Sequence, residues 1–263
     1  MKRKKLPRTI SAEKPIDTSR HLCYNGSTDQ KCGKESDTMA QILYRDPHLL
    51  LCCKPAGTPA QPDPTGGPDL LTEITVQHPH AHLVHRLDTP TGGVMVYALT
   101  HQAAASLSAL VQDHEHFAKE YLAVLPSPPS ESEGVWTDYL YHDRRANKAY
   151  VTEPRRGSKQ ARLAFRTVSV LADGHTLVLV RLYTGRTHQI RVQFASRGLP
   201  LVGDGKYGSR EKCPFIGLWS YRMCFPHPVT GKPIGAEIRP DRDRLPWSYF
   251  DLPETLPPLP YHP

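Results

Sequence analysis

Long apolar runs, a secretory leader and dense cysteine are all missing from this chain of 263 residues. No window approaches the roughly 18 consecutive apolar residues of a membrane span, and the first residues lack the apolar stretch of a secretion signal. The six cysteines are too few for a disulfide-built secreted scaffold, and none lies in a C-x-x-C pair typical of structural zinc. We therefore expect a cytoplasmic protein with reduced thiols and no membrane association.

Regular alternation of strands and helices is also missing, which argues against a doubly wound parallel sheet. Short apolar runs between turns predict strands at 41–44, 49–53, 93–99, 117–125, 135–141, 147–152, 161–171, 176–183, 221–225 and 234–238. Helices are predicted at 70–77, 101–113 and 186–197, the last ending before Gly198. This inventory favours an α+β domain around a mixed or largely antiparallel sheet.

Charge is distributed unevenly along the chain. Residues 1–38 carry nine Lys/Arg against five Asp/Glu without apolar periodicity, which predicts a basic, disordered tail before one domain at 39–263. Residues 39–143 carry four Lys/Arg against twelve Asp/Glu, whereas residues 144–166 carry eight against one. Such a basic segment inside a folded domain indicates a polyanion partner, although a solvated strand face fits equally well.

One candidate for chemistry is the segment from His85 to Gly93, which reads His-Arg-Leu-Asp-Thr-Pro-Thr-Gly-Gly. Asp88 stands between a short apolar lead-in and a Gly-rich turn that enters a predicted strand. A turn of this kind can present a carboxylate beside a cleft, and Arg86 supplies a cation two residues away. The alternative is an aspartate that only initiates the turn through bonds to nearby backbone N–H groups.

Two further segments carry donors and an aromatic ring. Arg186, His188, Gln189 and Arg191 crowd the start of the third predicted helix, where N–H groups and fork-shaped donors attract anions. Ile190 adds an apolar side chain there. The alternative is an amphipathic helix with solvated arginines.

In the predicted strand at 117–125, Lys119 and Tyr121 share one face, where a ring could stack on a base beside a cation. Buried tyrosines in sheets are common, so this pair is weak support by itself.

Histidine is concentrated at positions 78, 80, 82 and 85, just before Asp88. On an extended segment the first three would share a face, as metal ligands might be arranged. The spacing is not that of a dinuclear hydrolase, so a metal-dependent hydrolase is kept as the less favoured alternative.

Together these segments resemble the RluA-type family of RNA pseudouridine synthases. The family's signature H-R-L-D-x-x-T-S-G reads here His85-Arg-Leu-Asp-Thr-Pro-Thr-Gly-Gly93. A second signature reads Thr184-Gly-Arg-Thr-His-Gln-Ile-Arg191, followed by Gly198-Leu-Pro-Leu-Val-Gly-Asp-Gly-Lys-Tyr-Gly208. The blocks Lys54-Pro-Ala-Gly57 and Lys119-Glu-Tyr-Leu-Ala123 also match, and all four stand in the family's order over roughly residues 40–240. Gly92 replaces the family's serine, and because glycine is permissive we expect a looser catalytic turn.

The resemblance implies a pseudouridine synthase fold: a mixed, mostly antiparallel sheet with flanking helices and a central RNA-binding cleft. It implies that Asp88 is the catalytic carboxylate, that Tyr121 stacks on the flipped uracil, and that Arg191 keeps Asp88 charged. Arg86 would fill the space that the flipped base leaves, and Ile190 would lie beneath it. Lys119, Arg186, His188 and Gln189 complete the expected RNA-binding set.

The same resemblance implies an isomerase that needs no cofactor and no metal, acting on tRNA or rRNA. Asp88 could act by attacking C1′ or by taking a proton from C2′, and the sequence leaves both open. Residues 1–38 leave no room for an S4-type RNA-binding domain, and a monomer is expected. Besides the metal-dependent hydrolase, an RNA-binding protein or folding helper on the same scaffold stays open as an alternative. A glycoside hydrolase is disfavoured because Asp88 has no obvious partner carboxylate.

Overall fold

A computed structural model of the chain describes residues 40–63, 66–113, 115–254, 256 and 259. The tail expected at residues 1–38 lies outside this part of the chain. The strands are β1 (Gln41–Arg45), β2 (Leu49–Lys54), β3 (His82–Leu83), β4 (Gly92–Ala98), β5 (Ala118–Leu125), β6 (Glu133–Asp143), β7 (Lys148–Thr152), β8 (Ser158–Val170), β9 (Thr176–Leu182), β10 (Leu218–Pro226) and β11 (Pro233–Glu237). The helices are α1 (Leu70–Gln77), α2 (His101–Leu110) and α3 (Gln189–Ala195), with 3₁₀ turns η1 (Gly205–Tyr207) and η2 (Trp247–Tyr249).

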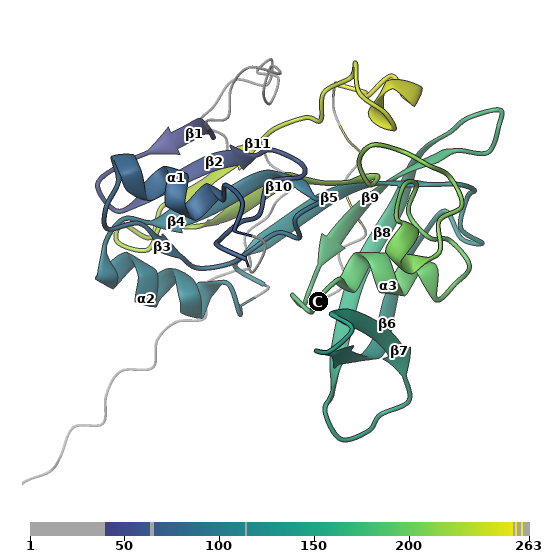
Figure 1. Cartoon of the computed structure of the whole chain (residues 1–263), viewed down its shortest axis with the longest axis horizontal. Coiled ribbons are helices and arrows are strands. Elements are labelled where there is room, and N and C mark those ends of the chain that lie inside the picture. The colour runs from purple at the N-terminus through teal and green to yellow at the C-terminus, as the bar shows by residue number, and fades with distance from the viewer. Residues whose placement is uncertain (1–39, 64–65, 114, 255, 257–258, 260–263) are drawn as a thin grey trace, which may run out of the picture.

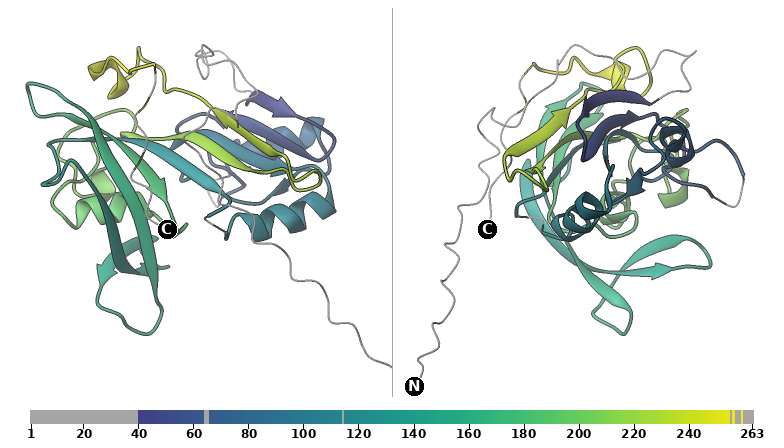
Figure 2. Two further views of the ribbon diagram at one scale, coloured as in Figure 1. Left: turned by 180° about the vertical axis from the view of Figure 1, so that it is seen from behind. Right: turned by 90° about the vertical axis from the view of Figure 1, so that its left-hand side faces the viewer.

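The strands form one sheet in the order β1-β2-β4-β10-β5-β9-β8-β6-β7, with β3 on β4 and β11 on β10. The sheet spans the molecule, with β1 and β7 at opposite ends (Figures 1 and 2). The β4–β10 pair is parallel, and the other described pairs are antiparallel. The mixed, mostly antiparallel sheet that the sequence predicts is therefore confirmed.

Helices cover both faces of this sheet because the strands bury side chains on both sides. Along β2, Leu49 and Leu51 pack in one core cluster with Leu107 of α2. The alternate residue, Leu50, packs in a second cluster with Leu70 of α1 and with α3. Side chains one residue apart in a strand point to opposite faces, so α2 lies on one face and α1 and α3 lie on the other.

Local sequence explains where two of the helices begin. The Asp69 side chain accepts a hydrogen bond from the Thr72 amide at 3.0 Å, and Thr100 accepts one from the Ala103 amide at 3.2 Å. Each side chain satisfies an N–H group that has no partner within its helix. No helix in the described part of the chain is long and apolar enough to cross a membrane.

Several sequence-based boundaries need correction. The helix predicted at 186–197 begins at Gln189, because the preceding His188 has a φ of 53°, in the left-handed region. The helix predicted at 101–113 ends at Leu110. Cys53 and Cys224 each take part in a disulfide, so the expectation of reduced thiols is wrong at these two positions, whereas Cys52 and Cys213 are free.

Candidate active site

A cavity of about 250 Å³ opens beside β5, near the middle of the sheet, and is lined by residues just after α2 and at the start of α3. Its lining includes all nine residues singled out in the sequence, which come from three separate segments of the chain. These are Arg86, Asp88, Lys119, Tyr121, Arg186, His188, Gln189, Ile190 and Arg191. The fold therefore brings the three candidate segments into one site, as their resemblance to a single family implies.

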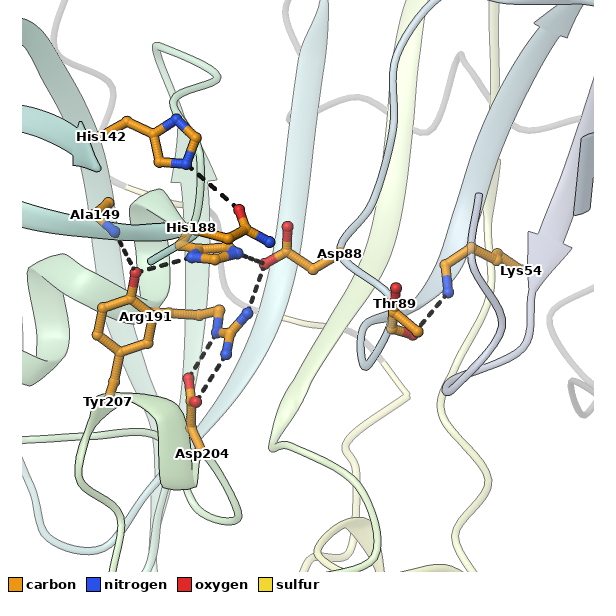
Figure 3. Close-up of polar contacts among 10 residues, drawn as sticks. Lys54, Asp88, Thr89, His142, Ala149, His188, Arg191, Asp204 and Tyr207 are labelled. Carbon is orange, nitrogen blue, oxygen red and sulfur yellow. Dashed lines mark hydrogen bonds and ion pairs between the residues drawn. The ribbon is translucent and has the colours of Figure 1, made fainter. Parts of the chain in front are cut away.

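Asp88 lies in the loop that leads from β3 into β4, and its side chain is 23% exposed. Its Oδ2 atom is 2.9 Å from Nη1 of Arg191 on α3, so the predicted salt bridge is present (Figure 3). The Arg191 guanidinium also binds Asp204 through two bonds, Nε to Oδ2 at 2.7 Å and Nη2 to Oδ1 at 2.8 Å. Arg191 thus sits between two carboxylates, and they raise the pKa of its guanidinium despite its burial. The buried arginine stays charged and pairs with Asp88 in a fixed orientation.

Tyr207 supports this arrangement from the other side. Its ring lies under the Arg191 guanidinium, 5.1 Å from the ring centroid to Cζ. Its hydroxyl accepts the Ala149 amide proton at 2.9 Å and lies 2.8 Å from Nδ1 of His188. Burial raises the pKa of the Tyr207 hydroxyl to about 12, so it is protonated at neutral pH.

His188 lies close to Asp88 as well. Its Nε2 atom is 3.7 Å from Asp88 Oδ2, and its side chain is 7% exposed. Burial lowers the pKa of His188 to about 4, with a smaller opposing effect from Asp88. The imidazole is therefore neutral at physiological pH.

Strand β5 supplies the opposite wall. Lys119 and Tyr121 are both buried and both line the cavity, as their spacing in one strand predicts. Lys119 Nζ donates to the Val111 carbonyl at 3.4 Å and lies 5.2 Å from the Phe117 ring centroid. Burial lowers the pKa of Lys119 to about 8 and raises that of Tyr121.

The remaining predicted residues differ in solvent exposure and in their hydrogen bonds. Arg86 is exposed at the cavity, and Ile190 is buried in its wall. Arg186 donates from Nε to the Gln160 carbonyl at 3.0 Å. Gln189 uses its amide inside the protein: Oε1 accepts from Thr184 and from the Arg186 amide, and Nε2 donates to the Arg162 carbonyl. These bonds build the turn before α3, and RNA contact by Gln189 stays a prediction.

Sequence reasoning assigned no role to four residues that shape this site. Asp204 and Tyr207 stood inside a quoted block of the resemblance, which was the available signal. Lys54 begins another block of the resemblance. Its side chain is fully buried and its Nζ donates to the Thr89 carbonyl at 3.1 Å, beside Asp88 (Figure 3). Ala149 contributes only its backbone, which no side-chain pattern reveals.

The histidine-rich segment has a structural explanation. His85 Nε2 accepts the Val96 amide proton at 3.1 Å, and burial lowers the pKa of this imidazole to about 3. The His82 and His101 rings pack in a tilted arrangement with centroids 4.5 Å apart. Across the described residues, no group of three or more His, Cys, Asp or Glu side chains is arranged to hold a metal ion.

Gly92 is not loosely held, contrary to the expectation for a glycine in place of serine. It is buried in β4 and pairs with Trp219 of β10. A Cβ atom at this position would lie 2.4 Å from Cζ3 of Trp219 and 3.0 Å from the Ala56 amide nitrogen. The Trp219 ring occupies the space that a serine side chain would need.

Solved structures define the class of this fold. A human protein, RNA Pseudouridylate Synthase Domain Containing 1, superposes with a TM-score of 0.65 at 25% identity, over 77% of this chain and 84% of that one. The sheet with its central cavity is thus a pseudouridine synthase fold.

Sequence comparisons identify the family. A model of the RNA pseudouridylate synthase family matches residues 48–196. The dual-specificity RNA pseudouridine synthase RluA of Salmonella typhi is 31% identical over 207 residues, covering 76% of this chain and 93% of that protein. The ribosomal large subunit pseudouridine synthase D of Zymomonas mobilis is 30% identical, covering 79% of this chain and 71% of that protein. The chain belongs to the RNA pseudouridylate synthase family and is of the RluA type, an isomerase that forms pseudouridine in RNA.

Proposed function

We propose that this enzyme isomerises a uridine of tRNA or rRNA in the central cavity, with Asp88 as the catalytic carboxylate. The observation that carries the proposal is the 2.9 Å pair between Asp88 and Arg191 in the wall of the cavity. A cavity of about 250 Å³ suits one base with part of its sugar better than helical RNA. The target nucleotide would then have to leave its stack, which costs a few kcal/mol.

Several lining residues have a place in this reaction. Arg86, exposed at the cavity, fills the gap that the flipped nucleotide leaves in the RNA. Tyr121 stacks on the uracil and Ile190 packs beneath it, since both present apolar surface to the cavity. Asp88 then attacks C1′ or takes the C2′ proton, and the bond from C1′ to N1 breaks.

The freed uracil turns within the cavity so that C5 faces C1′. The new bond forms between C5 and C1′ as the bond from Asp88 to C1′ breaks or, in the other route, as Asp88 returns its proton to C2′. C5 then loses its hydrogen to solvent, and N1 gains a proton. The base and sugar are retained, so the product is an isomer of the substrate. Arg191 acts by pairing with the Asp88 carboxylate and orienting it before the reaction begins.

RNA outside the cavity would contact the basic segment from Arg144 to Arg166, together with Arg186 and Arg197. Arg144 and Arg145 are exposed between β6 and β7, which extend beyond the rest of the sheet in Figure 1. Such contacts position RNA without reading its sequence. The proposal includes one catalytic domain at residues 39–263 that works as a cytoplasmic monomer, with residues 1–38 as a basic extension.

The test measures tritium release from RNA labelled at C5 of uridine and taken from cells that lack this enzyme. Wild type should release tritium from a tRNA or an rRNA pool, because C5 loses its hydrogen in the reaction. Asp88→Asn should release none above background while keeping its melting temperature within about 3 °C. Asp241→Asn, a carboxylate outside the cavity, is the matched control and should retain wild-type release.

Retention of wild-type release by Asp88→Asn would contradict the catalytic role of Asp88. RNA binding by wild type without release from either pool would instead favour the alternative of an RNA-binding protein on this scaffold.

A further inference from the structure

His188 stands between Asp88 and Tyr207, with one ring nitrogen facing each. Nδ1 lies 2.8 Å from the Tyr207 hydroxyl, and Nε2 lies 3.7 Å from Asp88 Oδ2 (Figure 3). The backbone that places the ring has a φ of 53°. Left-handed backbone is uncommon for residues other than glycine, and it concentrates where a side chain must be held in a particular position.

The tautomer of His188 follows from the contacts of the Tyr207 hydroxyl. The Ala149 amide can only donate, so the Tyr207 oxygen must accept that bond. Nδ1 of His188 is the other hydrogen-bond contact of this hydroxyl among the described residues, so donation to Nδ1 is the arrangement that uses the hydroxyl's single proton. Nδ1 therefore accepts, and the one proton of the neutral imidazole is on Nε2, which faces Asp88.

We propose that His188 is a positioning residue whose Nε2–H holds the Asp88 carboxylate in its reactive orientation, and that Tyr207 and the Ala149 amide determine which ring nitrogen carries that proton. This inference rests on the proposed catalytic role of Asp88. It gives His188 a task distinct from binding RNA.

Geometry around the carboxylate supports this task. Arg191 Nη1 and His188 Nε2 both approach the same oxygen, Oδ2, which leaves Oδ1 for the substrate. A bond from Nε2–H beside the bond from Arg191 would restrict rotation of the carboxylate. The 3.7 Å separation exceeds the usual range of a hydrogen bond, about 2.7–3.2 Å, and such contacts often shorten once substrate is bound.

Two substitutions separate a positioning role from simple anchoring of Tyr207. In His188→Gln, the side-chain amide reaches the place of Nε2 and can still donate toward Asp88. In His188→Asn, the shorter amide reaches only the place of Nδ1 and keeps a partner for Tyr207. Asparagine also tolerates left-handed backbone better than glutamine, so stability should favour His188→Asn.

Single-turnover tritium release, with enzyme in excess over C5-labelled RNA, provides the readout. His188→Asn should slow release about tenfold or more, the effect of losing a hydrogen bond to a charged group, with its Kd for RNA unchanged. His188→Gln should stay within about threefold of wild type, although it melts at the lower temperature. Equal losses in both variants, or a faster rate for His188→Asn, would overturn the proposal.

Tyr207→Phe tests the assignment of the proton. Without the hydroxyl, either nitrogen of His188 can carry the proton, and the single-turnover rate should fall several-fold. Adding Tyr207→Phe to His188→Asn should cause no further loss, because the two residues act through one contact. If the rate loss of the double variant equals the product of the two single losses, Tyr207 acts independently of His188. That result would contradict this part of the proposal.

Asp88→Asn in the same assay distinguishes failure of the proposed function from failure of the positioning role of His188. If Asp88→Asn keeps the wild-type rate, the proposed function itself fails. If it is inactive while His188→Asn keeps the wild-type rate, only the positioning role of His188 fails.

Discussion

Lys54 shows how one buried side chain can organise the turn that carries Asp88. Its Nζ donates to three carbonyl oxygens, those of Pro55 at 2.9 Å, Thr58 at 2.5 Å and Thr89 at 3.1 Å. Three acceptors match the three N–H donors of an ammonium group. Thr89 follows Asp88 directly, so Lys54 ties this turn to the end of β2. Burial lowers the pKa of Lys54 to about 7, so holding it in the fold has a pH-dependent cost.

Lys54→Met removes the three hydrogen bonds of the ammonium group and the pH-dependent cost of burying it. The pKa of Lys54 is lower in the folded protein than in the unfolded chain. Between about pH 7 and pH 10, Lys54 is therefore protonated in the unfolded chain and largely deprotonated in the folded protein. The free energy of unfolding of wild type should therefore rise relative to Lys54→Met across this window, by at most about 1.4 kcal/mol per pH unit. Urea unfolding of both proteins at pH 7, 8 and 9 measures the difference, and a difference independent of pH would mean that Lys54 keeps its proton when folded.

At the scale of elements, the parallel pairing of β4 with β10 joins the two halves of the sheet. Gly92 and Gly93 pair with Trp219 and Ser220 in the parallel register. A Cβ at Gly93 would lie 2.1 Å from the Ser220 carbonyl oxygen, and φ there is +115°, so only glycine fits without strain. Strand β10 then pairs with β5, which carries Tyr121. The two glycines thus let the Asp88 loop approach the wall that bears Tyr121.

Gly92→Ser, which restores the family's residue, should destabilise this chain by about 2 kcal/mol, the usual size of overpacking in a core. Combined with Trp219→Leu, its cost should shrink, because the smaller side chain vacates the contested space. Chemical unfolding of both single variants and the double variant measures the coupling. Gly67→Ser, where an added Cβ meets nothing within 4 Å, is the control and should be close to neutral. Additive costs would show that Trp219 does not conflict with a side chain at position 92.

At the scale of the whole molecule, a basic segment lies at one end of the sheet. Residues 39–143, which carry an excess of acidic side chains, build β1 to β6, and β6 lies beside β7 at that same end. The basic segment at 144–166 lies on β7, β8 and their turns, beside α3. An anionic RNA would be attracted to this basic segment, which would position it with respect to the central cavity.

Replacing Arg144 and Arg145 by glutamine should weaken RNA binding without slowing the chemical step. If each arginine neutralises one phosphate, the slope of log K against log salt should fall in magnitude by roughly 1.4–1.8. Filter binding at several salt concentrations measures the slope, and single-turnover release at saturating RNA should match wild type. The control replaces Arg242 and Arg244, beyond β11, and should leave the slope unchanged. An unchanged slope for the first pair would place the RNA elsewhere.

The sequence by itself determined what depends on neighbours along the chain. Alternating apolar residues located most strands, and side-chain caps such as Asp69 and Thr100 mark helix starts. The four motif blocks named the family and brought nine side chains forward as one site. The start of α3 was misplaced by three residues, because the left-handed backbone at His188 leaves no mark in apolar periodicity.

Tertiary structure alone decided which atoms meet. Arg191 and Asp88 are 103 residues apart in sequence, and Ala149 and Tyr207 are 58 apart. The family resemblance implied the first of these pairs. It did not reveal that Asp204 shares the guanidinium, or that His188 lies between Tyr207 and Asp88. Such contacts depend on how elements far apart in the sequence are placed relative to one another. The physical reason is that sheet register and close packing, rather than local propensity, set that placement.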